Sequence, residues 1–358
     1  MNKGLLRRLV AGKALVIGAL LTLAVPGAAY ANTVSVTVKT PGATLGPTTI
    51  DSSISTSAHC ASGLVSGGGI DQAIGTGTGV NGNHVLGSEP SPDGTTEYTG
   101  STGVVGTDVA YWIAKGASGG QVISSFSTSP YAMCLTSNLI NHTQVVMNKI
   151  NAPNTSATVG LVTATCPANT VLLGGGAQVT PGNTGNFKPI AGFPTFNNAA
   201  HDFGKKAAAD GETNPDSWTA VGWDNSANAS NETYAYAICS GNGIGVSGVT
   251  VKVRYSEVSG PNTGSTGQNA TVNCGSGDGN LISGGAAISG GSVTTTDFTG
   301  PGAGGDHLNG SFPSDAGGNP VGDGTTTAAS WTASTHTGGM ASTNNHSDAW
   351  ALCANDGV

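Results

Sequence analysis

The chain has 358 residues, of which only 9% are charged and 58 are glycine. Residues 1–31 hold four of the 12 basic residues and none of the 20 acids, which leaves a net charge of −12 on the remainder. This charge argues against partners made of nucleic acid, whose phosphates require clustered Lys and Arg, and against anionic membrane surfaces. Few segments have helical periodicity, so the composition predicts an extracellular protein rich in strands and loops.

The first 31 residues have the features of a secretory signal peptide. Lys3, Arg7 and Arg8 form a basic start, residues 14–25 are mostly apolar, and Ala29-Tyr30-Ala31 is a small-x-small cleavage site. The segment is too short for a stop-transfer helix, and no second apolar run of spanning length follows. We therefore expect an exported protein, secreted or at the cell surface, with no transmembrane segment.

The rest of the chain repeats one pattern three times. In each copy a cysteine precedes a glycine cluster, such as Gly174-Gly175-Gly176, and a second cysteine ends an aromatic-Ala-apolar triplet, such as Tyr236-Ala237-Ile238. The two cysteines of a copy are 74, 73 or 79 residues apart, and a tryptophan stands 22, 21 or 22 residues before the second. The pattern predicts three repeats with boundaries at 32–141, 142–245 and 246–358.

Each repeat is expected to consist of strands. It opens with a strand-like segment, at 34–38, 144–147 or 249–255. The segment that ends in the second cysteine is apolar on both faces, which indicates a central strand. The glycine cluster indicates a bulge, or a close approach over which an aromatic ring lies. The residues between the glycines and the tryptophan should form long surface loops with at most one short strand.

These features predict an all-β fold of three disulfide-linked antiparallel repeats, arranged as a β-prism or as tandem β-sandwiches. The repeat pattern favours the disulfides Cys60–Cys134, Cys166–Cys239 and Cys274–Cys353, although a scheme that links neighbouring repeats is an alternative. In the chain-entropy model each such loop stabilises the folded state by about 4–5 kcal/mol.

The middle repeat resembles a module of secreted bacterial proteins with the pattern C-P-A-G…GGGA…P-T…W-T-A…Y-A-I-C-A. The matching residues are Cys166-Pro167-Ala168, Gly174-Gly175-Gly176-Ala177, Pro194-Thr195, Trp218-Thr219-Ala220 and Tyr236-Ala237-Ile238-Cys239. The proline is missing after Cys60 and Cys274. The threefold layout is also similar to that of β-prism proteins of the vitelline membrane outer layer type. The resemblance implies an extracellular location and a fold, but no reaction.

The candidate ligand-binding residues are two histidines and a tryptophan. His84 and His307 stand six residues before Pro90 and Pro313, where the middle repeat has Lys188. We expect both histidines to be exposed in loops, with a site shared by two repeats as the alternative. Trp112, Trp218 and Trp331 are expected in the core, whereas Trp223 lies outside the repeat pattern and is the candidate for an exposed, sugar-stacking ring.

Catalytic and metal sites are not expected. The segment 77–82 matches G-x-G-x-x-G but follows no clear strand. No H-x-x-x-H or C-x-x-C spacing occurs, so neither zinc nor another cofactor is predicted. The oxygen-rich segments 224–232 and 276–280 are weak candidates for calcium. A glycosidase would need two acids from the loops, and the candidates are Glu89, Asp93, Asp210, Glu212 and Asp216.

The sequence therefore predicts a secreted, non-catalytic structural or adhesion protein of a bacterial cell surface or extracellular matrix. The alternative is a lectin-like module that binds glycans, and the third hypothesis is an exported hydrolase. The expected partners are an extracellular glycan or a cell-wall or surface protein.

Overall fold

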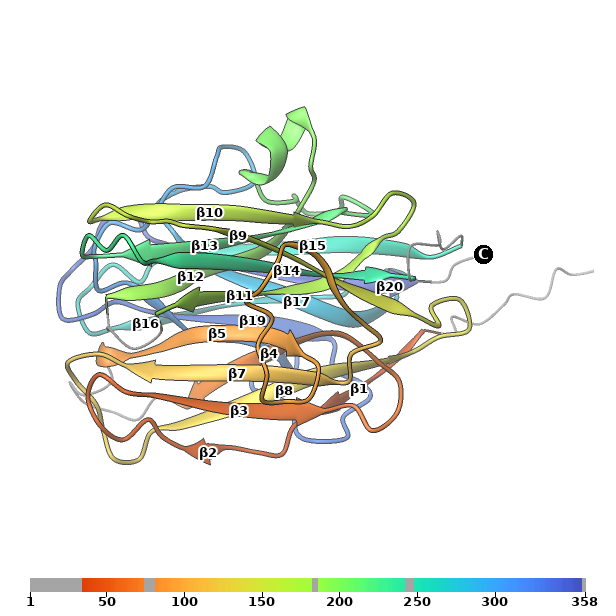
Figure 1. Cartoon of the computed structure of the whole chain (residues 1–358), viewed down its shortest axis with the longest axis horizontal. Helices are drawn as coiled ribbons and strands as arrows, with labels where there is room; N and C mark the ends of the chain where they lie inside the picture. The colour runs from red at the N-terminus through yellow and green to blue at the C-terminus, as the bar shows by residue number, and fades with distance from the viewer. Residues whose placement is uncertain (1–33, 74–80, 182–185, 242–247, 356–358) are drawn as a thin grey trace, which may run out of the picture.

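A computed structural model describes residues 34–73, 81–181, 186–241 and 248–355, and these residues form a nearly all-β structure (Figure 1). The predicted signal peptide and residues 77–80 of the G-x-G-x-x-G match lie outside the described residues. The elements are β1 (Ser35–Lys39), β2 (Thr44–Leu45), β3 (Ser53–His59), β4 (Leu64–Ala73), β5 (Asn83–Ser91), β6 (Gly103–Thr107), β7 (Tyr111–Ser118), β8 (Ser127–Thr136), β9 (Thr143–Ile150), β10 (Thr158–Thr165), β11 (Leu172–Thr180), β12 (Phe187–Thr195), the short 3₁₀ segment η2 (Ala199–Gly204), β13 (Ser217–Asp224), β14 (Glu232–Ser240), β15 (Thr250–Ser259), β16 (Gly267–Asn273), β17 (Asn280–Ser289), β18 (His307–Ser314), β19 (Ser330–His336) and β20 (His346–Asn355).

The strands form three antiparallel sheets. Sheet A has the order β1-β8-β4-β18-β19-β16, with β2 also paired to β8. Sheet B has the order β3-β7-β5-β11-β14-β9-β6, and sheet C has the order β10-β13-β12-β17-β20-β15. The strands β8, β14 and β20, which end in the second cysteine of each repeat, have a partner on both sides, as predicted for central strands. The predicted opening strands are confirmed as β1, β9 and β15.

Every sheet combines strands from two repeats. We call β4, β11 and β17 the glycine strands, and β5, β12 and β18, which contain the Pro-Ser or Pro-Thr pair, the proline strands. The two kinds meet in the middle of each sheet through two residue pairs, for example Ala177 with Ser88 and Gln178 with Gly87 in sheet B. The first repeat shares sheet A with the third, the second shares sheet B with the first, and the third shares sheet C with the second. The repeats thus close into a ring, which is the prism arrangement of the two that the sequence predicts.

The disulfides join neighbouring sheets within each repeat. The predicted pairs Cys60–Cys134, Cys166–Cys239 and Cys274–Cys353 are confirmed. Cys60 directly follows β3 of sheet B, whereas Cys134 lies on β8 of sheet A. The other two pairs link sheet C to sheet B and sheet A to sheet C in the same way. Each cross-link therefore fastens one edge of the prism.

A tryptophan from one sheet covers a glycine of the next. A Cβ atom at Gly68 would lie 2.4 Å from Cγ of Trp112, one at Gly175 would lie 2.3 Å from Cγ of Trp218, and one at Gly284 would lie 2.2 Å from Cγ of Trp331. All three tryptophans are buried, as predicted. Any side chain at these glycine positions would occupy the space of the indole. The repeated spacing of cysteine, glycines and tryptophan along the chain therefore follows from packing between the sheets.

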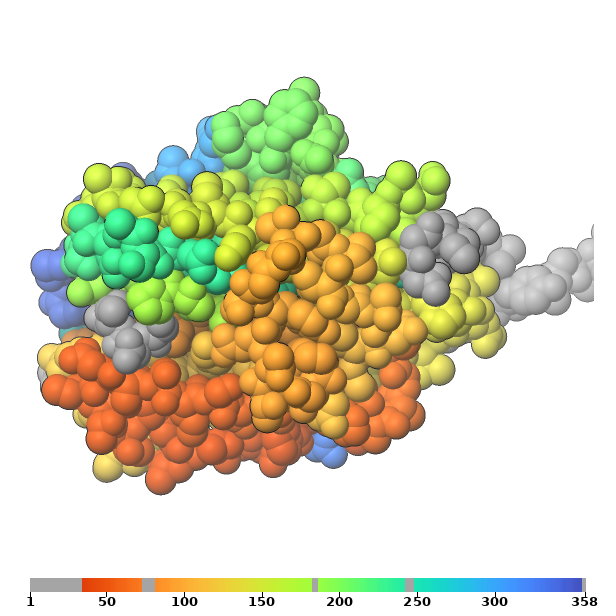
Figure 2. Space-filling model, viewed as in Figure 1, coloured from red at the N-terminus to blue at the C-terminus, as the bar shows by residue number. Residues whose placement is uncertain are grey.

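The proline strands correct one prediction. The sequence predicts that the residues before Pro90, Pro194 and Pro313 lie in loops with at most one short strand. Instead, β5, β12 and β18 are eight or nine residues long and lie in the middle of their sheets. The true excursions follow these strands. In the first repeat, the segment after β5 crosses the outside of sheet B and ends in β6, which pairs with β9, so it forms a raised ridge over this face (Figure 2).

Candidate functional site

Three equivalent side chains meet at one end of the prism. His84, Lys188 and His307 each lie near the start of a proline strand, and together they line a cavity of about 270 Å³. Its rim carries the polar side chains of Gln121, Asn186 and Asn225, which come from the segments before the proline strands or after the tryptophan strands β7 and β13. Every repeat thus contributes to this cavity, which we call the axial pit.

The two histidines have the same hydrogen bonding. Nδ1 of His84 lies 2.9 Å from the carbonyl oxygen of Gly82, and Nδ1 of His307 lies 2.6 Å from that of Gly305. A carbonyl oxygen only accepts hydrogen bonds, so each Nδ1 carries the proton and each Nε2 presents a lone pair. The ring centroids are 6.3 Å apart. Neither Nε2 atom has a hydrogen-bond partner among the described residues.

Burial, with help from a neighbouring charge, keeps both histidines neutral. Burial, and then the ammonium group of Lys188, lower the pKa of His84 to about 4 and that of His307 well below its ordinary value. Burial also lowers the pKa of Lys188 to about 8, against the opposing effect of Asp306 and Asp224. At neutral pH one ammonium group and two neutral imidazole rings therefore lie beside the pit.

The structure contradicts two predictions about exposure. His84 and His307 are each 2% exposed, so they are not the exposed loop residues that the sequence suggested. The two histidines instead lie together, as in the alternative prediction of a site shared by two repeats. Lys188, at the equivalent position of the remaining repeat, lies beside them. Trp223 is 6% exposed, because Gly300 and Val159 lie against its ring. It therefore offers no open face for stacking on a sugar.

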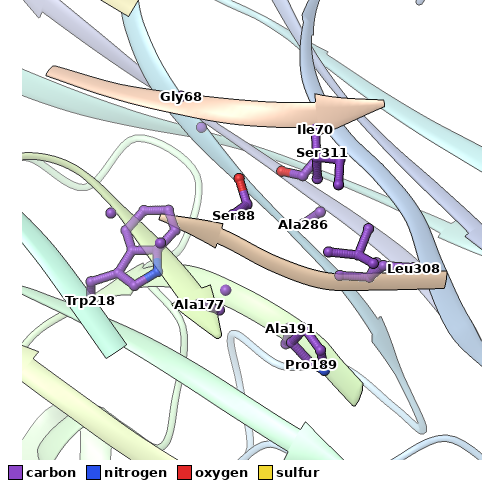
Figure 3. A pocket seen from close by; sticks show the side chains of 15 residues that line it. Gly68, Ile70, Ser88, Ala177, Pro189, Ala191, Trp218, Ala286, Leu308 and Ser311 are labelled. Carbon is purple, nitrogen blue, oxygen red and sulfur yellow. The ribbon is translucent and has the colours of Figure 1, made fainter. Parts of the chain in front are cut away.

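A second cavity lies in the interior between the three sheets (Figure 3). Its volume is only about 40 Å³, and its lining is mostly glycine and apolar side chains, including Trp218, Ala177 and Leu308. A space of this size admits little more than a water molecule. Nε1 of Trp218 lacks a hydrogen-bond partner within the described part of the chain. The interior cavity is therefore a packing defect beside an indole rather than a binding site.

A buried acid lies outside the interior, beneath the ridge over sheet B. Glu89 on β5 is fully buried, and burial, reinforced by Glu97, raises the pKa of its carboxyl group well above the ordinary value. Lys115 Nζ lies 2.7 Å from Glu97 Oε1, and the side-chain amide of Gln178 donates to the other oxygen of Glu97. Neither carboxyl oxygen of Glu89 has a hydrogen-bond partner among the residues described.

The repeats explain why Glu89 stands out. The equivalent residues, one position before the proline, are Phe193 and Phe312, which pack on Trp350 and Tyr131 with ring centroids 5.5 and 6.4 Å apart. The residue of sheet B that is equivalent to Trp350 and Tyr131 is Tyr236. An acid in place of a phenylalanine is a signal that comparison of the three repeats could have found.

The other candidate acids have separate partners. Asp93 caps the turn at 95–96 through hydrogen bonds to both residues, and Asp210 pairs with Arg254 at 3.3 Å. Glu212 Oε2 lies 3.1 Å from Nε2 of His201, and Asp216 accepts from the backbone of Asn197. Asp93, Asp210, Glu212 and Asp216 each therefore already have a partner within the protein.

The two candidate calcium segments also have internal partners. Asp278 pairs with Arg254 at 2.6 Å and with Lys252 at 3.0 Å, and Asp224 accepts from Ser226 and Asn231. Within the described residues, no group of three or more His, Cys, Asp or Glu side chains is placed to hold a metal ion. In the same part of the chain, no helix is long and apolar enough to cross a membrane.

Comparison with known proteins gives no further guide to the site. No family model matches the chain, and no curated protein matches it.

Proposed function

We propose that this chain is an exported, non-catalytic adhesion protein of a bacterial surface or extracellular matrix, and that it contacts a surface protein through a projecting aromatic residue. The observation that carries the proposal is Phe203, in the 3₁₀ segment η2. Its side chain is 62% exposed, and the segment projects beyond sheet C as a knob (Figure 2).

The backbone of this knob is unfavourable for its own sequence. Asp202 and Phe203 both have left-handed conformations, with φ of 44° and 53°. This conformation costs an L-residue about 1–2 kcal/mol, and for a bulky side chain it is rare. Asn198 holds the turn by accepting hydrogen bonds from the backbone of Ala200 and His201. Strain that is held in place around an exposed ring is typical of a contact site.

The test is binding of the purified, oxidised protein to bacterial cells and to immobilised surface proteins. The variant Phe203→Asn removes the ring and suits a left-handed backbone, so it should bind at least tenfold more weakly without losing thermal stability. The matched control is Ile50→Asn, which removes another exposed apolar side chain (57% exposed) and should bind normally. Unchanged binding by Phe203→Asn would refute the proposal.

A lectin-like function is the second candidate, and the axial pit is the observation that favours it. The pit combines hydrogen-bond donors and acceptors from three repeats, which is the arrangement that a polar small molecule requires. Elution of bound protein by a specific sugar would support this function over adhesion to protein. Binding that no sugar reduces would support adhesion through the knob.

A further inference from the structure

One of the three disulfides differs from the others in its exposure. Five of the six cysteines are buried, each at most 7% exposed, whereas Cys274 is only partly buried. Cys274 directly follows β16 of sheet A, and its partner Cys353 lies on β20 of sheet C. Exchange of a disulfide with a thiol requires access to one of its sulfur atoms. Exposure therefore distinguishes the pair Cys274–Cys353, with Cys274 as the accessible half.

A cavity of about 240 Å³ lies beside Cys274, which forms part of its lining. The cavity is enclosed by β1, by the start of β17 and by the segment 326–329 that precedes β19. Its lining includes the polar residues Asn280, Thr326 and Thr327. The volume is far larger than a single water molecule requires. The cavity therefore has room for a small thiol compound next to the accessible cysteine.

A basic residue stands opposite the second cysteine in this repeat alone. Lys252 on β15 is paired with Cys353, so the two side chains are neighbours on one face of sheet C. In the other two repeats the opening strand places an uncharged residue opposite the second cysteine, Thr37 or Gln144. A neighbouring cation stabilises a thiolate, and a thiol of lower pKa leaves faster in exchange. Lys252 therefore favours Cys353 as the leaving group.

The charged groups near Cys353 leave an excess of positive charge. Lys252 Nζ lies 3.0 Å from Oδ1 of Asp278, and Arg254 Nε lies 2.6 Å from Oδ2 of the same residue. Arg254 also pairs with Asp210 at 3.3 Å, but the Asp210 side chain is 53% exposed, so this pair is weakened by water. Two cations thus share one buried carboxylate beside the disulfide.

We propose that Cys274–Cys353 is a site of thiol–disulfide exchange with a small thiol compound, which becomes attached to Cys274. The thiolate of the compound attacks Sγ of Cys274, a new S–S bond forms, and the bond between Cys274 and Cys353 breaks. Cys353 leaves with the electron pair as a thiolate and then takes a proton from water. No further oxidant or reductant is needed, because one disulfide replaces another. The exchange releases the cross-link between sheets A and C. The inference goes beyond the adhesion function and does not depend on it.

The experiment treats the folded, oxidised protein with cysteine or glutathione and follows the three disulfides separately. Samples are quenched with acid, unfolded and alkylated, and peptide mapping by mass spectrometry then identifies the state of each cysteine. Near-UV circular dichroism recorded in parallel shows whether the protein stays folded. The other two disulfides are internal controls, because their cysteines are 74 and 73 residues apart, close to the 79 of Cys274 and Cys353.

We expect Cys274–Cys353 to open at least about tenfold faster than either other disulfide, at a rate proportional to the thiol concentration. The added thiol should be found on Cys274 and the alkylated cysteine at 353. Ala328→Leu should slow the exchange, because Ala328 lines the cavity and a larger side chain fills part of it. The matched control is Ala61→Leu, an exposed position beside Cys60, which should leave the rate unchanged.

Two further variants test the leaving group. Lys252→Met should also slow the opening of Cys274–Cys353, because it removes the cation opposite Cys353. Lys252→Arg keeps the charge and should preserve most of the rate. Neither variant should change the rates of the other two disulfides.

Other results would overturn the assignment. If another disulfide opens as fast, or if all three open only as the circular dichroism signal is lost, exchange follows unfolding and there is no specific site. A thiol attached to Cys353 instead of Cys274 would contradict the direction of attack. A rate that Ala328→Leu leaves unchanged would refute approach through the cavity, and one that Lys252→Met leaves unchanged would refute the role of Lys252.

Discussion

The substitution Gly192→Ser should stabilise the protein by completing the one indole that lacks a partner in the repeated core. Nε1 of Trp112 and of Trp331 each donates to a serine hydroxyl, Ser88 and Ser311, at 2.9 Å. At the equivalent place beside Trp218 the second repeat has Gly192. A Cβ atom there would lie 3.3 Å from Nε1 of Trp218 and 3.5 Å from Cβ of Ala177, so a small side chain fits with little adjustment.

The magnitude follows from two effects. Satisfying a buried N–H group gains about 1–2 kcal/mol, and replacing a glycine inside a strand gains about 0.5–1 kcal/mol. Part of this is lost if a water molecule already occupies the interior cavity next to the indole (Figure 3). We therefore expect the free energy of unfolding to rise by about 2 kcal/mol, with a rise in melting temperature on the order of 3 °C for a chain of this size.

Thermal and denaturant unfolding would measure the effect, with Gly192→Ala as the control. The alanine variant should show only the backbone gain, so the difference between Ser and Ala isolates the hydrogen bond. In a Trp218→Phe background this difference should disappear. A serine variant no more stable than the alanine variant would refute the reasoning.

Three further predictions concern single buried positions. Gly175→Ala should destabilise the protein by about 3 kcal/mol, because the new Cβ overlaps both the Trp218 ring and the carbonyl oxygen of Tyr236 at 2.4 Å. The control Gly322→Ala, whose Cβ meets no atom within 4 Å, should have little effect. Equal unfolding free energies for the two variants would contradict this account of the packing. Glu89→Gln should gain stability over the wild type as the pH rises above about 4.5. The reason is that the raised pKa of the Glu89 carboxyl group stabilises the wild-type fold at low pH, and this stabilisation is lost as the pH rises toward the folded-state pKa. A difference in unfolding free energy between variant and wild type that is the same at pH 4 and pH 8 would exclude this. In the wild type, His84 should destabilise the fold as the pH falls from 6.5 to about 4, by up to about 3 kcal/mol. His84→Asn should remove this part of the pH dependence. Profiles of unfolding free energy against pH that run parallel for the wild type and the variant would be the contrary result.

The sequence allowed the covalent and packing pattern of the repeat to be predicted. The disulfide pairs, the burial of Trp112, Trp218 and Trp331, and an aromatic ring over the glycines are all confirmed. These features were accessible because each depends on residue types that occur at nearly fixed spacing in three copies. A glycine covered by an indole tolerates no other side chain, so packing imposes the pattern on the sequence directly.

The positions of the polar residues could not be predicted in the same way. His84, Lys188 and His307 are about 100 or more residues apart, and they meet only because the sheets are shared between repeats. Spacing along the chain does not reveal which strands pair across repeats. Trp223 was predicted to be exposed because it breaks the repeat pattern, but Val159 and Gly300 bury it. Departure from a repeat therefore does not by itself indicate exposure.

Comparison among the repeats separates what maintains the fold from what distinguishes the site. The cysteines, the covered glycines and the three core tryptophans are the same in every repeat, and each has a structural role. The pit differs, because its three equivalent positions hold His84, Lys188 and His307. Three identical side chains around such an axis would bind a small ligand in three equivalent orientations. Two imidazole rings and one ammonium group remove this equivalence around the axis.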